Sequence, residues 1–255
     1  MRVLATLHRW WGVAFCLLFA MWFASGIVMH FVPFPARSAT AASPAIDRSH
    51  AIIDRIDHDQ WTVAGDYDAD RPLDRIALND AAGTEIYISS KSGKIVLATT
   101  RTERLANYAG SIPHWIYPTE LRHHRAAWTA LMWWLSLLAT LGAVIGVVIG
   151  LIRLARGPAH RGLQRWHHMS GLIFAPFLLA WIFSGFLSMD DGTLFAHGDA
   201  LFHALHKLEF EPLASHPWLR TSAIAGLCLC GFAFSITGVV LAWRRIPTRA
   251  SQISR

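Results

Sequence analysis

The sequence has few charged residues and few cysteines, and both shortages restrict what the protein can be. Asp, Glu, Lys and Arg make up 16% of the 255 residues, against about 25% in an ordinary soluble domain. The three cysteines, Cys16, Cys228 and Cys230, all fall within long apolar runs, so they cannot form a disulfide framework for a polar domain. The composition excludes a soluble globular chain of the usual kind.

Motifs for nucleotide cofactors are also absent from the sequence. It contains no glycine-rich fingerprint for a nicotinamide or flavin nucleotide and no phosphate-binding glycine loop. The polar segment 33–125 holds no nucleophile paired with a base. The sequence therefore contains no site of its own for a nucleotide reductant.

Four apolar runs are each long enough to cross a bilayer. They cover roughly residues 10–32, 127–152, 168–189 and 218–243, and a transmembrane helix needs about 20 apolar residues. We therefore expect a membrane protein of the all-α class, a four-helix transmembrane bundle embedded in the lipid bilayer. The boundaries that we assign to the four helices are 1–32, 126–152, 167–189 and 218–245.

The net charge of +6 is distributed unevenly along the chain. Arginines precede the first span, fill the loop 153–166 and occupy the tail 246–255, whereas acidic residues are frequent in 190–217. By the positive-inside rule, both termini and the loop 153–166 face the cytoplasm, and 33–125 and 190–217 face the other side. The basic residues thus report topology, and we expect no nucleic-acid partner.

The four spans form two repeated helix pairs. When the sequence is laid against itself so that His8 faces His167, the following residues also coincide: Gly12 with Gly171, Phe15 with Phe174, Trp22 with Trp181, Ser25 with Ser184 and Gly26 with Gly185. A weaker match places His124 and Gly146 opposite His216 and Gly238. Repeats in membrane proteins commonly have their functional site at the interface between the repeats.

The polar segment between the first two spans predicts a small α+β domain of extracytoplasmic location. Residues 45–56 have helical apolar spacing, and the period then changes to two around Trp61 and Val63 and in the runs 76–78, 86–88 and 95–97. Turn residues at 80–83 and 91–94 indicate an antiparallel meander. We further expect helices over 101–110 and 201–206, and packing surfaces at the glycines of the second and fourth spans.

Most of the fourteen histidines cluster at the two ends of the spans. One group is cytoplasmic: His8, His160, His167 and His168. The other lies at the opposite boundary: His30, His114, His123, His124, His203, His206 and His216. Polar side chains at membrane depth are costly and indicate function, and two imidazole layers in a helical bundle suit two haems, each held by a pair of histidines.

Two alternatives to haem ligation follow from the same residues. Histidines at the ends of spans also serve as interfacial anchors, and His203 and His206 lie at i, i+3 on one helix face, where they could bind zinc or copper. In favour of haem, Gly12 and Gly171 each follow a histidine by four residues. A residue without a side chain is what a porphyrin plane needs at that position on the histidine face.

Several segments resemble the PepSY-associated transmembrane family. They are His8-Arg9-Trp10-Trp11-Gly12 with Ser25-Gly26, His167-His168 with Gly171 and Ser184-Gly185, the ending Thr237–Arg245, and the strand-like segments 83–88 and 92–96. The resemblance covers nearly the whole chain. It implies a bacterial inner-membrane protein with a PepSY-like domain at 33–125. Family members include haem-containing ferrisiderophore reductases, which implies haem b as the cofactor here.

Carried over to these positions, the resemblance favours His8 with His167 or His168 for the cytoplasmic-side haem. On the other side it favours two of His114, His124, His203 and His206. The expected function is b-type di-haem electron transfer to a periplasmic acceptor such as a ferric siderophore or another ferric chelate. The alternative is a non-enzymatic, membrane-anchored binding module of PepSY type, for protease control or metal binding.

Overall fold

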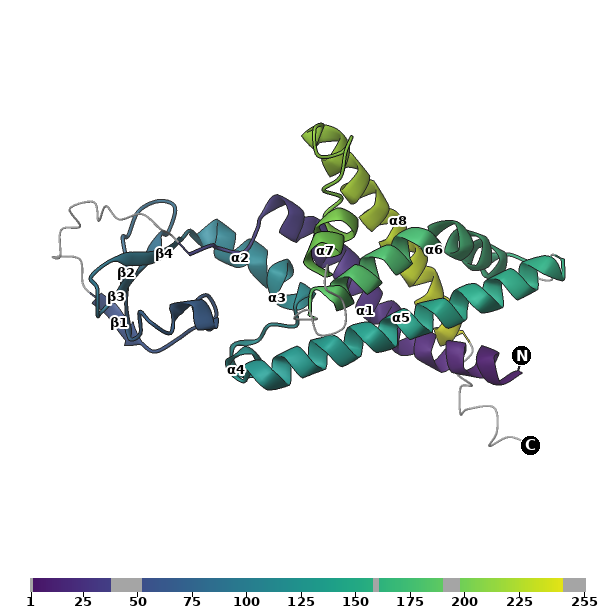
Figure 1. Ribbon diagram of the computed structural model, residues 1–255, viewed down its shortest axis with the longest axis horizontal. Coiled ribbons are helices and arrows are strands. Elements are labelled where there is room, and N and C mark those ends of the chain that lie inside the picture. The colour runs from purple at the N-terminus through teal and green to yellow at the C-terminus, as the bar shows by residue number, and fades with distance from the viewer. Residues whose placement is uncertain (1, 38–51, 158–160, 190–197, 245–255) are drawn as a thin grey trace. The chain divides into compact units, whose positions relative to one another are not determined.

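The computed structural model describes residues 2–37, 52–157, 161–189 and 198–244. Its four long apolar helices are α1 (Arg2–Phe31), α5 (Arg125–Ala155), α6 (Leu163–Leu187) and α8 (Pro217–Trp243) (Figure 1). All four are long and apolar enough to cross a membrane, so the chain is a multi-pass membrane protein. The four predicted spans are thereby confirmed as helices.

The chain forms two compact units, residues 1–24 with 130–255 and residues 25–129. The first unit contains most of the long helices and the short helix α7 (Gly198–His206). Within it, α6 lies closest to α7 and α8. The Phe23 ring of α1 contacts Phe174 and Trp181 of α6, with ring centroids 5.6 and 5.8 Å apart. The helix predicted over 201–206 is α7.

Glycines of α5 and α8 are packing surfaces, as the sequence predicts. Aromatic side chains of α1 pack against them. A Cβ added to Gly142 would lie 2.7 Å from the Trp11 ring, and one added to Gly231 would lie 2.6 Å from the Phe23 ring. Each position therefore has to lack a side chain so that an aromatic ring can lie against the helix backbone.

The second unit contains a four-stranded antiparallel sheet in the order β1-β2-β3-β4. Its strands are β1 (Ile52–Ile56), β2 (Leu73–Ala77), β3 (Glu85–Ser89) and β4 (Ile95–Thr99). Gly83 and Gly93 have positive φ in the two predicted turns. The predicted meander is confirmed for β2 to β4. The core of the unit is made by six buried side chains: Trp61, Tyr67, Leu73, Tyr87, Val96 and Leu97.

Two predictions for this unit are wrong. The helix expected over 45–56 is a strand in its last part, β1, while 45–51 lie outside the described residues. Short isoleucine-rich runs suit either structure, and pairing with β2, including an Arg55–Asp74 ion pair at 2.7 Å, favours the strand. The alternation at Trp61 belongs to a turn, because the Asp59 carboxylate accepts the backbone N–H groups of Trp61 and Thr62.

The remaining helices of the unit are short: η1 (Gly65–Tyr67), α2 (Arg101–Ala109), α3 (Ser111–His114) and α4 (Thr119–His123). The predicted helix 101–110 is α2. It begins with a capping box, in which the Thr100 hydroxyl accepts the Glu103 N–H and the Glu103 carboxylate accepts the Thr100 N–H. The Arg104 guanidinium binds the Glu85 carboxylate of β3 at 3.1 Å, which fixes α2 to the sheet.

We expect Leu97→Ala to destabilise this unit by about 2–5 kcal/mol, because the fully buried leucine leaves a cavity that the sheet cannot close. Limited proteolysis of the full-length protein in detergent measures the effect as faster cleavage within 52–110. Leu105→Ala removes the same atoms from an exposed position on α2 and is the matched control. Equal cleavage rates for the two variants would contradict the core assignment.

Candidate functional site: a histidine-lined cavity

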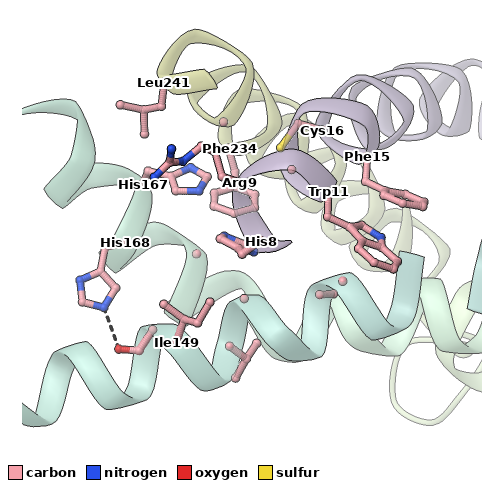
Figure 2. Close-up of a pocket in the computed structure, with 18 of the residues that line it drawn as sticks. His8, Arg9, Trp11, Phe15, Cys16, Ile149, His167, His168, Phe234 and Leu241 are labelled. Carbon is pink, nitrogen blue, oxygen red and sulfur yellow. Dashed lines mark hydrogen bonds between the residues drawn. The ribbon is translucent and has the colours of Figure 1, made fainter. Parts of the chain in front are cut away.

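A cavity of about 210 Å³ lies among α1, α5, α6 and α8, within the first unit. Three of the histidines singled out from the sequence, His8, His167 and His168, line it together (Figure 2). Most other lining groups are apolar or glycine. Imidazoles from α1 and α6 thus meet at one place, as the repeat of these two helices suggests.

His8 is positioned by a glycine of the facing helix. A Cβ on Gly146 would lie 2.8 Å from the His8 ring, so the imidazole rests directly against the α5 backbone. Within the part of the chain that the structure describes, the ring of His8 has no hydrogen-bond partner. An imidazole that lines an apolar cavity in this way has a ring nitrogen available to a ligand.

His167 is held on two sides. Its Nδ1 lies 2.8 Å from the Thr237 hydroxyl, and its ring stacks on Phe234 with 4.7 Å between centroids and 10° between planes. The Thr237 hydroxyl donates to the Phe234 carbonyl oxygen at 2.6 Å. Because a hydroxyl has one proton, the threonine oxygen accepts from Nδ1–H, and the lone pair of His167 is on Nε2.

His168 is held at the other ring nitrogen, Nε2. Its Nε2 lies 2.8 Å from the carbonyl oxygen of Gly150 (Figure 2). A carbonyl oxygen only accepts, so Nε2 carries the proton and is committed to the backbone of α5. The two adjacent histidines therefore differ in the nitrogen that each presents, a distinction that the sequence motif does not contain.

The charged groups at the cavity are Arg9 of α1 and Arg153 of α5, and none of the described lining residues is acidic. Two guanidinium groups beside an otherwise apolar lining favour a ligand with an apolar body and an anionic edge. The residue types of the cavity are in this respect complementary to a haem, which has a flat apolar macrocycle and two carboxylates.

The two glycines of the His-Gly repeat have different surroundings. Gly12 lines the cavity, and nothing lies within 4 Å of the Cβ that a side chain would add there. Gly171 instead receives the Phe234 ring at 2.9 Å. Only Gly12 therefore provides the open face that the spacing argument requires. Because ligand sites usually measure 300–1,000 Å³, a macrocycle also requires the lining side chains to move outward.

The other predicted ligands include two that are held alike. In the first unit, Nδ1 of His206 lies 3.1 Å from the Ser184 hydroxyl and 3.0 Å from the Trp181 carbonyl oxygen. In the second unit, Nδ1 of His114 lies 3.1 Å from the hydroxyl of Ser25. Both serines are almost completely buried. Burial lowers the pKa of His206 to about 4, so its ring is neutral at physiological pH.

His124 and His203 have different environments. His124 follows α4, is exposed, and has its ring 5.6 Å from that of His123. His203 is partly exposed and its Nδ1 lies 2.6 Å from the Glu209 carboxylate. His203 and His206, which were predicted to share a helix face, therefore have different partners. His203 forms an ion pair at the surface, and His206 makes a buried contact with α6. Among the described residues, no group of three His, Cys, Asp or Glu side chains is placed to hold a metal ion.

Sequence reasoning missed the hydroxyl partners. Ser25 and Ser184 were visible as matched repeat positions, but not as contacts of histidines. One further signal was present: in the register that places His124 opposite His216, His114 falls opposite His206. Thr237 has no repeat signal, and only the fold brings it to His167.

Comparison of the chain with protein-family models, with curated proteins and with solved structures finds no match.

Proposed function

We propose that the protein is a b-type di-haem electron-transfer protein of the bacterial inner membrane, with both termini in the cytoplasm. It belongs, on this proposal, to the PepSY-associated transmembrane family, and residues 33–125 contain its PepSY-like extracytoplasmic domain. The observation that carries the proposal is the cavity in which the imidazoles of His8 and His167 meet beside Arg9 and Arg153.

The first haem would be held by His8 with His167 or His168, and Arg9 and Arg153 would bind its carboxylates. A bound haem supplies a one-electron Fe(III)/Fe(II) couple. The residues of the cavity would hold and surround the haem. The imidazoles would supply nitrogen ligands, Phe234 would fix the ring plane of His167, and the surrounding apolar side chains would exclude water. Low polarity around the centre and neutral nitrogen ligands both influence its reduction potential.

The second haem would take its ligands from two of the four histidines of the opposite layer: His114, His124, His203 and His206. Electrons would enter on the cytoplasmic side from quinol or a separate reductase, pass between the two haems, and leave to a periplasmic ferric chelate such as a ferric siderophore. Histidines lie at both ends of the spans, which is why the proposal has two centres in series.

The test is an optical spectrum of the full-length protein purified in detergent from cells supplied with a haem precursor. Reduction with dithionite should give a sharp b-type α-band, and a pyridine haemochrome assay should give about two haems per chain. A spectrum without haem bands would refute the proposal and would favour the non-enzymatic PepSY-type binding module. His216→Ala, which alters an exposed histidine that is not among the proposed ligands, is the matched control for substitutions of the cavity histidines.

A further inference from the structure

Among the proposed ligands, three histidines are held at Nδ1 by a side-chain hydroxyl from another helix, and we term them the hydroxyl-anchored histidines. The pairs are His114 with Ser25 at 3.1 Å, His206 with Ser184 at 3.1 Å and His167 with Thr237 at 2.8 Å. In each pair the two residues come from different helices. His8, His124 and His203 have no such contact among the described residues, and His168 is held at Nε2 by the Gly150 carbonyl oxygen.

Two of the pairs are repeats of one another. Ser25 faces Ser184 in the register that aligns His8 with His167, and His114 faces His206 in the register that aligns the second and fourth spans. The same contact has therefore formed between equivalent residues of both helix pairs, once in each unit. A contact kept in both copies of a repeat indicates a requirement shared by the two copies.

In the Ser184 and Thr237 pairs, the direction of the hydrogen bond follows from the second partner of the hydroxyl, and we assign the same direction to the Ser25 pair because it is the repeat equivalent of the Ser184 pair. The Ser184 hydroxyl donates to the Trp181 carbonyl oxygen at 3.0 Å, and the Thr237 hydroxyl donates to the Phe234 carbonyl oxygen at 2.6 Å. Each hydroxyl oxygen is left as an acceptor, so the imidazole donates from Nδ1–H. The Trp181 carbonyl oxygen, 3.0 Å from Nδ1 of His206, requires the same tautomer. In that tautomer Nε2 holds the lone pair.

We propose that Ser25, Ser184 and Thr237 are positioning residues, which fix the rotation and tautomer of their histidines so that Nε2 can ligate a haem iron. The inference rests on the proposed haem function and assigns ligands within it. It selects His167 over His168, whose Nε2 donates to Gly150. Within each unit it selects the hydroxyl-anchored histidine among the remaining candidates, His206 over His203 in the first unit and His114 over His124 in the second. Outer hydrogen bonds of this type orient ligating histidines in many metal sites.

The positioning role predicts a shift in reduction potential. A hydrogen bond from Nδ1–H to an acceptor increases the basicity of Nε2 and stabilises ferric iron over ferrous iron. Its loss should favour the reduced state by about threefold to tenfold in the equilibrium constant, where tenfold corresponds to about 59 mV for a one-electron couple. Packing alone has no reason to change the potential in this direction.

The experiment is a redox titration of the full-length haem protein and its variants, followed at the α-band. Thr237→Val keeps the shape of the side chain and removes its hydroxyl. Ser25→Ala and Ser184→Ala also remove the hydroxyl, and each leaves the side chain one heavy atom smaller. Ser235→Ala is the matched control, because Ser235 is a fully buried serine of α8 whose hydroxyl contacts only Gly231 among described residues. Thr237→Ser retains the hydroxyl and is the conservative variant at this position.

We expect each hydroxyl-free variant to raise the potential of one haem or to lose that haem, with the other haem retained as a reporter of folding. Ser235→Ala and Thr237→Ser should keep the parent values. Two haems with unchanged potentials in all three hydroxyl-free variants would overturn the positioning role and leave the haem function intact. A parent protein without haem would overturn both.

Discussion

Gly12→Leu is expected to remove about one haem per chain without destabilising the haem-free protein. Nothing lies within 4 Å of the Cβ added at Gly12, which lines the cavity beside His8. The leucine side chain therefore enters free space and, in a helix interior, replaces glycine by a better helix former, worth roughly 0.8 kcal/mol. It becomes harmful only when a macrocycle must occupy the same space. The measurements are haem content by pyridine haemochrome and thermal unfolding of protein made without haem precursor.

Gly226→Leu is the control for this prediction. Gly226 also has nothing within 4 Å of an added Cβ, but it is exposed on α8 and does not line the cavity. The two substitutions thus make the same chemical change in a transmembrane helix. If Gly12→Leu kept its full haem content, the space in front of Gly12 would not be a haem site and the cavity would need another ligand.

The long helices were predictable because their signal is summed over many residues. Each apolar run spans more than twenty positions, so individual errors cancel, and the helices found differ from the predicted ranges mainly at their ends. α6 begins at Leu163 rather than at His167, because helical hydrogen bonding continues through Gln164 and Arg165. These polar residues are invisible to a hydropathy argument, which finds the apolar core of a helix and not its first turn.

The polar unit shows where local patterns fail. Residues Ile52–Ile56 have a helical and an extended interpretation of equal merit, and the choice depends on β2, which lies about twenty residues further along the chain. Trp61 is buried because it fills the core, although its backbone is in a turn made by Asp59. Burial of alternate residues is evidence for a strand only when a partner strand is present to pair with it.

The candidate site was predictable in its residues but not in its chemistry. The repeat brought attention to His8 and His167, and the structure places both at one cavity. The sequence alone left His167 and His168 as alternative ligands, since either of two adjacent histidines could be paired with His8. The distinction comes from Thr237, which is 70 positions away in sequence, and from a backbone carbonyl of α5. Contacts of this kind depend on helix packing, for which a single sequence has no local signal.

His167→Ala and His168→Ala should therefore differ clearly in haem content, although the two residues are neighbours. We expect His167→Ala to lower the haem content from about two to about one per chain, because it removes the Nε2 lone pair of a histidine that lines the cavity. His168→Ala should keep both haems, since it removes a hydrogen bond to the Gly150 carbonyl, worth about 1 kcal/mol of stability. Pyridine haemochrome assays of the two purified variants, matched for yield in detergent, make the comparison.

Added imidazole strengthens this test, because it distinguishes a missing ligand from a damaged fold. Alanine at position 167 leaves a space next to Phe234 that a free imidazole can fill, since the stacking face of the phenylalanine ring remains. Haem content and the low-spin optical spectrum of His167→Ala should recover with imidazole, whereas a misfolded chain would not respond. The reverse pattern, with haem lost from His168→Ala and kept in His167→Ala, would require Gly150 to release His168 and would make Thr237 a purely structural partner.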